Sequence, residues 1–189
     1  MPNLPISQLP ELTAITQNSE FAVAQSGVTY KVKAGNISSG IAYGAFLSSV
    51  AQSALTTTVA YSISADTTTL SNGVTVVDGS KFTVASAGTY NLQFSVQIES
   101  TKGGSPETVD IWLSKNGTNV DYSNTQLSLN SNNGKTFAAW NFVEPLNAGG
   151  YFELKWSATD SAIRLVTNGT QTNPTRPAVP SVIVTITQV

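Results

Sequence analysis

The fold class follows from one stretch of the sequence, Leu92-Gln-Phe-Ser-Val-Gln-Ile98, in which every second residue is apolar. Successive side chains of a β-strand point to opposite faces, so this alternation predicts a strand with one face in a core and the other outside. Residues 152–156, Phe-Glu-Leu-Lys-Trp, repeat the pattern. Residues 181–189 carry β-branched side chains on both faces, which predicts a strand that is covered on both sides.

The chain on either side of these stretches also reads as strands and turns. Further strands are expected at residues 81–84, 109–113, 137–142 and 162–166. The evidence for helix is poor, and only residues 44–55 could hold a short helical turn. Residue pairs that accept positive φ predict hairpin loops at Asn72-Gly73, Asp78-Gly79, Asn116-Gly117, Asn133-Gly134 and Asn168-Gly169. Turn signals that recur about every 8 to 12 residues are typical of an antiparallel β-sandwich or barrel. The sequence therefore predicts an all-β fold.

The composition excludes several classes of function. The 189 residues hold 11 acids, 9 bases, no His and no Cys. Nine scattered bases do not neutralise a run of phosphates, so no nucleic acid is expected as a partner. Without Cys or His, the usual thiolate nucleophile, the commonest general base and the commonest zinc ligand are missing. No apolar run is long enough to insert into a membrane, and the first residues do not read as a secretion signal.

A domain boundary is expected near residues 35–40, which divides the chain into an arm (1–40) and a main domain (41–189). In the arm, residues 6–12 are interrupted by proline, and residues 20–25 and 28–32 flank the turn Ser26-Gly27 as a small hairpin. Two strands alone are marginally stable in water, so the hairpin needs support. We expect it to attach to a copy of itself or to another protein; the alternative is that it folds back on its own main domain. The apolar side chains available for attachment are those of Leu9, Leu12, Phe21, Val23, Tyr30 and Val32.

Two parts of the sequence resemble known proteins. Residues 6–37, with Ile6-Ser-Gln-Leu-Pro-Glu-Leu12 and Glu20-Phe-Ala-Val-Ala-Gln25, resemble the short N-terminal attachment module of tailed-phage virion proteins. Residues 42–189 resemble a jelly roll of the tumour-necrosis-factor and complement type, in the version common in phages. The matching pieces are Ala42-Tyr-Gly-Ala-Phe46, Phe82-Thr-Val84, Gly88-Thr-Tyr90, Ile111-Trp-Leu-Ser-Lys-Asn-Gly117, Ala139-Trp-Asn-Phe142, Leu146-Asn-Ala-Gly149 and residues 180–189.

The resemblance implies an antiparallel jelly-roll β-sandwich that assembles as a homotrimer, preceded by the small hairpin arm. It also implies a location on the virion, on the outer surface of the capsid or on the tail. Symmetric homo-oligomers are the common form of assembly among soluble proteins.

The candidate chemical residues give no catalytic, cofactor-binding or metal site. The acids Glu107, Asp110, Asp121, Glu144, Glu153 and Asp160 are scattered, with neither the paired spacing of a glycosidase nor that of a calcium loop. Trp112 points opposite to its neighbours Ile111 and Leu113, and Trp140 is in phase with Phe142. Either Trp fills the core, which we favour, or it stacks outward on a sugar or on a neighbouring subunit.

The segment 169–180 holds three prolines, which make it stiff and extended. Asn173, Pro174, Arg176 and Pro177 form either an exposed contact loop or a linker that delivers the last strand.

These observations favour a non-enzymatic phage structural protein without cofactor. The first hypothesis is a capsid decoration (cement) or head-surface protein that docks by its arm on the major capsid protein or another virion protein. The absence of a long shaft in 189 residues favours this hypothesis. The alternative is a short tail fibre or spike tip that binds a host surface glycan, for which the Ser, Thr and Asn content provides hydrogen-bonding groups.

Overall fold

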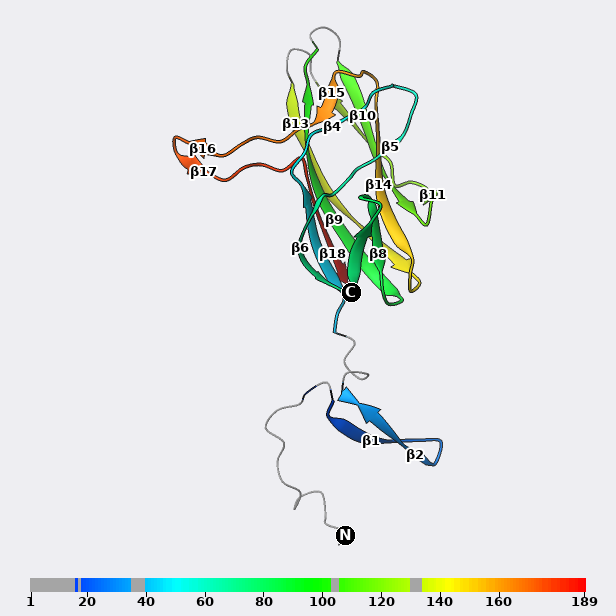
Figure 1. Cartoon of the computed structure of the whole chain (residues 1–189). Helices are drawn as coiled ribbons and strands as arrows, with labels where there is room; N and C mark the ends of the chain where they lie inside the picture. Colours follow the sequence, from blue (N-terminus) through cyan, green and yellow to red (C-terminus); the bar gives the residue numbers. More distant parts are fainter. Residues whose placement is uncertain (1–15, 17, 35–39, 103–105, 130–133) are drawn as a thin grey trace. The chain divides into compact units, whose positions relative to one another are not determined.

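A computed structural model describes residue 16 and residues 18–34, 40–102, 106–129 and 134–189 (Figure 1). All eighteen elements of these described ranges are β-strands, which confirms the all-β prediction. The chain divides into two compact units, Met1–Gly40 and Ile41–Val189.

The first unit contains one hairpin. Strand β1 (Glu20–Gln25) pairs antiparallel with β2 (Val28–Lys33), and the register joins Glu20 to Lys33 and Gln25 to Val28. Ser26 and Gly27 between them have φ values of 52° and 78°, which is the two-residue turn that the Ser-Gly pair predicts.

One layer of the second unit is the sheet that we call the β9 sheet, after its longest strand. Its order is β4-β15-β9-β18-β3-β6, and β13 pairs with the other side of β9. Every pairing is antiparallel, and β18 lies in the middle between β9 and β3. The strands are β3 (Tyr43–Ser48), β4 (Gln52–Ser53), β6 (Thr67–Asn72), β9 (Gly88–Ser100), β13 (Lys135–Leu146), β15 (Ile163–Leu165) and β18 (Val182–Gln188).

The other layer is the β14 sheet, in the order β11-β10-β14-β8-β7. Two further strands extend it, because β12 pairs with β10 and β5 pairs with β14. Its strands are β5 (Tyr61–Ser62), β7 (Val74–Val77), β8 (Lys81–Val84), β10 (Glu107–Lys115), β11 (Thr118–Asn119), β12 (Thr125–Leu129) and β14 (Tyr151–Ala158).

The core lies between the two layers and consists of the inward residues of each alternating strand. Leu92, Val96 and Val184 of the β9 sheet face inward and are fully buried, as are Ile111 and Leu154 of the β14 sheet. Phe46 and Phe82 meet across the layers with ring centroids 5.4 Å apart. Burial of each such side chain stabilises the fold by about 1.5–3 kcal/mol. Trp156 is buried in the same core.

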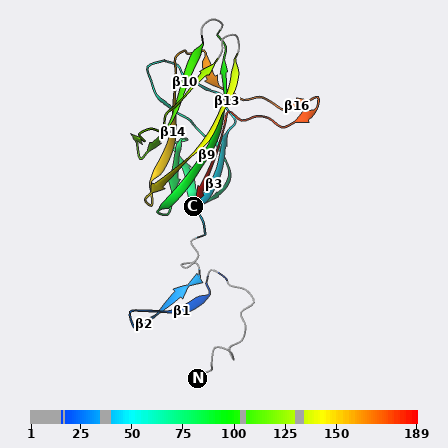
Figure 2. The same ribbon diagram turned by 180° about the vertical axis from the view of Figure 1, so that it is seen from behind.

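A hairpin projects sideways from the sandwich, in orange in Figure 1 and again in the reverse view of Figure 2. It consists of β16 (Gln171–Thr172) and β17 (Thr175–Arg176), and a bridge between Asn168 and Val179 closes its base. Asn168-Gly169 therefore opens this protrusion and is not itself a tight turn, contrary to the prediction.

The other predicted turns have different outcomes. Asp78-Gly79 and Asn116-Gly117 have positive φ at both residues and connect β7 to β8 and β10 to β11, as predicted. At Asn72-Gly73 only the glycine has positive φ (69°), and the chain passes there from the β9 sheet to the β14 sheet. This connection is a crossing between layers and not a hairpin. Asn133 lies outside the described residues.

At two places the single chain differs from what the sequence indicates. Residues 44–55 hold no helical turn, because β3 is held in the sheet by hydrogen-bonded neighbours on both sides, β18 and β6. Strand β18 is covered on its inner face only, since Ile183 on the outer face is 44% exposed in the single chain. The remaining predicted strands lie within β8, β9, β10, β13 and β14, and the predicted strand 162–166 extends one residue beyond each end of β15.

Candidate functional site

The outer face of the β9 sheet is an uncharged surface. Residues that pair across neighbouring strands share a face, so the register of β13, β9, β18 and β3 arranges their outward side chains in rows. Three consecutive rows are Ala139, Ser95, Ile183 and Leu47; Asn141, Gln93, Thr185 and Ala45; and Val143, Asn91, Thr187 and Tyr43. None of these side chains carries a charge, and aliphatic groups alternate with hydroxyls and amides. We call these three rows the uncharged face.

Charged groups border the uncharged face at one end. Glu99 lies two residues beyond Gln97 on the same side of β9, and it pairs with Lys135 at 3.6 Å and with Arg164 at 3.4 Å. Phe137, which is 67% exposed, stands opposite Gln97 just inside this border. The uncharged face is therefore a bounded patch of the sheet.

Trp140 packs against the core from the edge strand β13. Its ring lies edge-on to Phe94, with centroids 4.7 Å apart, and Phe142 stacks on Phe94 at 6.1 Å. The core role that we favoured for Trp140 is confirmed. Its buried Nε1 finds no acceptor among the described residues.

Trp112 lies on the outer face of the β14 sheet, contrary to the core role that we favoured for it. It pairs with Lys155 of β14, while Ile111 and Leu113 on either side of it are fully buried. Its indole Nε1 donates a hydrogen bond of 2.9 Å to Oδ1 of Asn119 on β11. The alternation correctly predicted that Trp112 points away from Ile111 and Leu113. The Trp112 side chain is half-buried outside the core.

A hollow of about 480 Å³ lies beside Trp112, and we call it the Trp112 hollow. Its size is within the usual range for ligand sites, about 300–1,000 Å³. The residues that line it come from β10, β11, β14 and the segment that connects β11 to β12; they are Asp110, Trp112, Asn119, Val120, Asp121, Tyr122, Asn124 and Ser157.

Tyr122 is displayed in the Trp112 hollow by an unusual backbone. Its φ is 61°, in the left-handed region that bulky residues rarely adopt, and its side chain is fully exposed. Such a conformation costs on the order of 1–3 kcal/mol and is found preferentially at functional sites. Tyr122 was not among the residues predicted from the sequence. The available signal was the outward phase of Trp112, followed by Asp121 and Tyr122 after the Asn116-Gly117 turn.

The polar groups of the Trp112 hollow are only partly used by the protein. Oδ1 of Asp110 accepts hydrogen bonds from Asn124 at 2.8 Å and from Gln126 at 3.4 Å. Among the described residues, no hydrogen bond is found to the carboxylate of Asp121. The hollow therefore offers carboxylate, amide and hydroxyl groups next to two aromatic rings.

Glu153 forms a separate, buried polar cluster on the β14 sheet. The residue is 5% exposed, and its Oε1 accepts hydrogen bonds from Ser62 at 3.0 Å and from Ser80 at 3.1 Å. Oε2 lies 3.3 Å from Nζ of Lys155. Burial raises the pKa of Glu153, but the hydrogen bonds from Ser62, Lys155 and Ser80 outweigh burial, so the pKa lies below its ordinary value. An ionised, fully satisfied carboxylate of this kind holds strands together.

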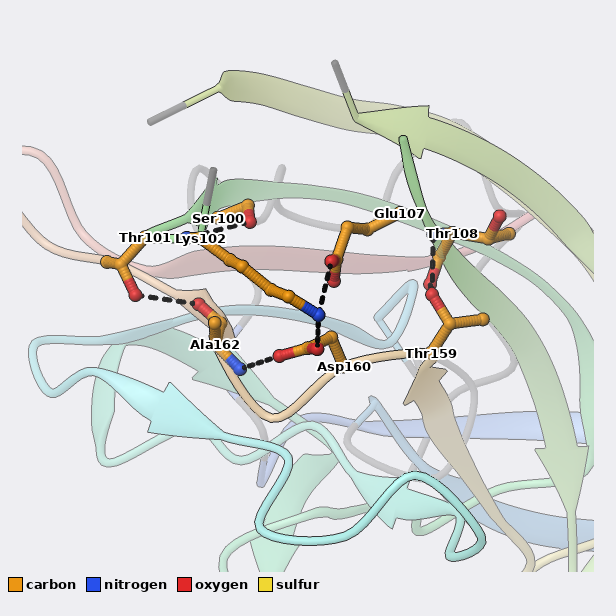
Figure 3. A network of polar contacts seen from close by, with 8 residues as sticks. All are labelled: Ser100, Thr101, Lys102, Glu107, Thr108, Thr159, Asp160 and Ala162. Atoms are coloured by element: carbon orange, nitrogen blue, oxygen red, sulfur yellow. Dashed lines mark hydrogen bonds and ion pairs between the residues drawn. The ribbon is translucent and has the colours of Figure 1, made fainter. Parts of the chain in front are cut away.

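Two of the acids considered as catalysts meet at one end of the sandwich (Figure 3). Lys102 lies between them, with its Nζ 3.5 Å from Glu107 and 2.5 Å from Asp160. The hydrogen bond from Lys102 lowers the pKa of Asp160, and it raises the pKa of Lys102. A glycosidase needs one carboxyl group with a raised pKa. The pKa of Asp160 is lowered instead, so the arrangement is that of an ion pair.

The other polar findings concern Glu144 and possible metal or membrane sites. Glu144 pairs with Lys115 at 2.7 Å. Within the described ranges, no three acidic residues gather as a metal site would require. The same ranges contain no helix long and apolar enough to cross a bilayer.

The arm residues on β1 and β2 share one face of the hairpin. Phe21 pairs with Val32 and Val23 pairs with Tyr30, so the four side chains lie together on one side of the ribbon. Val23 and Tyr30 are exposed. The opposite side carries small residues and an ion pair between Glu20 and Lys31, whose charged atoms lie 2.9 Å apart. Leu9 and Leu12 lie outside the described residues.

The predicted contact loop is the tip of the projecting hairpin. Asn173 and Pro174 connect β16 to β17, Arg176 ends β17, and Pro177 follows it. All four are exposed. The segment is thus a displayed hairpin, although it also leads the chain to β18.

Comparisons with known proteins support the fold. No family model matches the sequence, and no curated protein resembles it significantly in sequence. Among solved structures, murine APRIL at pH 5.0 matches with a TM-score of 0.50 and 11% identity, over 79% of this chain and 100% of the APRIL chain. Murine APRIL at pH 8.5 matches over the same shares, with 11% identity and a TM-score of 0.48. The similarity to the first structure confirms the expected jelly roll of the tumour-necrosis-factor type.

Proposed function

We propose that this chain is a non-enzymatic structural protein of a bacteriophage particle, a capsid decoration or head-surface protein that assembles as a homotrimer and docks by its arm. The uncharged face of the β9 sheet carries the assembly part of this proposal. The phage part rests on the sequence resemblance of residues 6–37 and 42–189.

The uncharged face has the composition of a subunit interface. Interface cores are depleted of charged side chains and enriched in apolar groups, whereas solvated sheet faces are usually rich in Lys and Glu. A jelly roll that meets two copies of itself through this face covers Ile183, Val143 and Tyr43. The β-branched outer side of β18 then also becomes buried, as its sequence predicts.

The arm supports the docking part. Phe21, Val23, Tyr30 and Val32 form one apolar side of a ribbon of only two strands. A ribbon of this kind gains stability by placing its apolar side on another surface. We assign that surface to the major capsid protein or another virion protein. Three arms on one trimer would bind together, and linked sites raise avidity without new contacts.

The charge arrangement supports the non-enzymatic part. Asp160 and Glu153 have lowered pKa values and are held by Lys102 and Lys155. Carboxylates fixed in ion pairs are poor proton donors at neutral pH.

Two measurements test the proposal. Light scattering on the purified chain should give three times the 19.8 kDa of one chain. Undecorated heads of the source phage should bind the protein, and the double variant Val23→Ser, Tyr30→Ser should bind more weakly. The control variant Ala22→Ser, Ala24→Ser alters the other side of the ribbon and should bind normally. A stable monomer, or heads that bind neither form, would refute the proposal.

The second candidate function is a short tail fibre or spike tip that binds a host surface glycan. The Trp112 hollow favours it, because exposed aromatic rings beside amides and carboxylates suit a sugar. Blocking of phage adsorption by the isolated protein would support this candidate, and unchanged adsorption at saturating protein would count against it.

A further inference from the structure

We propose that the Trp112 hollow is a binding site for a neutral oligosaccharide. The inference deepens the second candidate function, and it stands on a single chain without the trimer. It combines three observations: a displayed tyrosine, an anchored tryptophan and a set of unused polar groups around them.

The side chain of Tyr122 packs against no other part of the described fold. A fully exposed ring buries no apolar surface, yet the backbone at Tyr122 adopts a strained left-handed conformation. The next residue, Ser123, holds this turn in place, because its buried hydroxyl accepts a hydrogen bond from the Leu113 amide and donates one to the Val120 carbonyl. Glycine would adopt the same conformation at lower cost, so a tyrosine on this fixed turn indicates a side chain held for contact with something else. A tyrosine ring offers an apolar face for the C–H side of a sugar and a hydroxyl at its edge.

Trp112 supplies a second, fixed aromatic surface. The hydrogen bond from its Nε1 to Asn119 fixes the orientation of the indole, and the strand pairing of β10 with β14 fixes its backbone. A ring that is already held loses little conformational entropy when a ligand stacks on it.

The polar groups around the rings match sugar hydroxyls. Asn119 uses its Oδ1 for Trp112, which leaves its amide N–H groups to donate. Asn124 uses its Nδ2 for Asp110, which leaves its carbonyl oxygen to accept. Asp121 and Ser157 add a carboxylate and a hydroxyl. Hydroxyl groups donate and accept, so they need this mixture of partners.

The charge of the lining selects the kind of sugar. Two carboxylates and no base line the Trp112 hollow. A uronic, sialic or sulfated sugar would place a like charge beside Asp110 and Asp121, which disfavours binding. A compact organic cation would suit the carboxylates, but it would leave the two side-chain amides and the hydroxyl of Ser157 without partners. The lining therefore favours a neutral sugar.

The test measures sugar binding directly, using the purified full chain on an array of neutral and anionic bacterial oligosaccharides. We expect binding to neutral oligosaccharides, and about a two- to tenfold loss of affinity or more in Tyr122→Gly, since aromatic contacts are worth about 0.5–1.5 kcal/mol beyond area burial. Glycine also relieves the strained φ, so the melting temperature of Tyr122→Gly should rise by about 1–3 °C. Lost binding with gained stability distinguishes a ligand contact from a structural role.

One control and one further site variant complete the experiment. Tyr30→Ala removes an exposed tyrosine from the other unit and should leave sugar binding unchanged. Asp121→Asn keeps the shape of the lining and should weaken binding to neutral sugars. Equal binding by Tyr122→Gly and the wild type, binding of anionic sugars only, or binding of choline in place of sugars would each overturn the inference. Because the assay uses no phage and needs no trimer, its failure would not bear on the assembly test above.

Discussion

The two sheets of the sandwich are alike inside and different outside. Their inward residues form one core, and both use the same two-residue alternation to reach it. The outer side of the β9 sheet carries the uncharged face, with aliphatic, amide and hydroxyl groups in rows. The outer side of the β14 sheet carries the Glu153–Lys155 cluster and the Trp112 hollow.

This difference separates the residues that stabilise the fold from the residues that the fold leaves available for contact. Core burial accounts for the inward residues of both sheets equally, so it does not explain why only one outer face lacks charge. Ion pairing and solvation account for the charges on the outer side of the β14 sheet, and we assign the uncharged face to contact with copies of the chain.

Ile183→Glu on β18 should have the largest effect. It places a carboxylate on the uncharged face, in the row of Ser95 and Leu47, where assembly would bury it without a partner at about 3 kcal/mol or more per chain. We expect monomers by light scattering, with a β-sheet circular dichroism spectrum. The matched control is Val77→Glu on β7, since Val77 is 43% exposed and Ile183 is 44% exposed. If both variants stay trimeric, the uncharged face is not the assembly surface.

Glu153→Gln should have the next largest effect. The amide keeps the shape but leaves Lys155 without its carboxylate, so the free energy of unfolding at pH 7 should fall by about 1–2 kcal/mol. The pKa of Glu153 is lower in the folded chain, so its contribution is present above the ordinary glutamate pKa of 4.5 and is lost as pH falls through the lowered value. Urea unfolding from pH 7 to pH 3 should show the two proteins converging in acid. A difference in unfolding free energy that stays constant with pH would refute the role of the ionised Glu153 in stability.

Tyr90→Phe tests the shared interior. The Tyr90 ring is fully buried, and its hydroxyl donates a 2.7 Å hydrogen bond to the carbonyl of Ser86. Loss of that bond should destabilise the fold by about 1 kcal/mol. Burial raises the pKa of Tyr90, so its contribution is present below pH 10 and disappears as pH rises through the raised value. Tyr61→Phe is the control, since the Tyr61 hydroxyl bonds the exposed Thr56 amide, and we expect a smaller loss in denaturant unfolding.

Asp160→Asn should have the smallest effect. It breaks an exposed ion pair with Lys102, and solvent and salt screen such pairs strongly. We expect a small decrease in melting temperature at low ionic strength that vanishes in 1 M salt, where screening acts over about 3 Å. A large decrease that persists in salt would mean that the pair supports the end of the sandwich by its geometry.

Local pattern predicted most of the fold. Residues 92–98 and 152–156 alternate strictly, and the structure places both in long central strands. The turns at Asp78-Gly79 and Asn116-Gly117 follow from residues that accept positive φ, which is a local property. Residues 44–48 escaped prediction because their partners, β18 and β6, are set by distant parts of the chain.

The candidate sites were less predictable, for a related reason. Alternation gives the side to which Trp112 points, but not whether another segment covers that side. Whether it is covered depends on residues 118–124, which comprise the edge strand β11 and the segment after it and which leave the hollow open. The uncharged face likewise appears only once the register joins β13, β9, β18 and β3.

The central place of β18 has a consequence for biosynthesis. Its residues 182–188 fill the slot between β9 and β3, so a nascent chain on the ribosome lacks the middle of that layer until they emerge. Until then, the neighbouring edges of β3 and β9 have unpaired backbone groups beside apolar side chains, which is the state most prone to aggregation. Folding of the layer therefore waits for translation to reach these residues, and a ribosome stalled earlier yields a product that depends on chaperones.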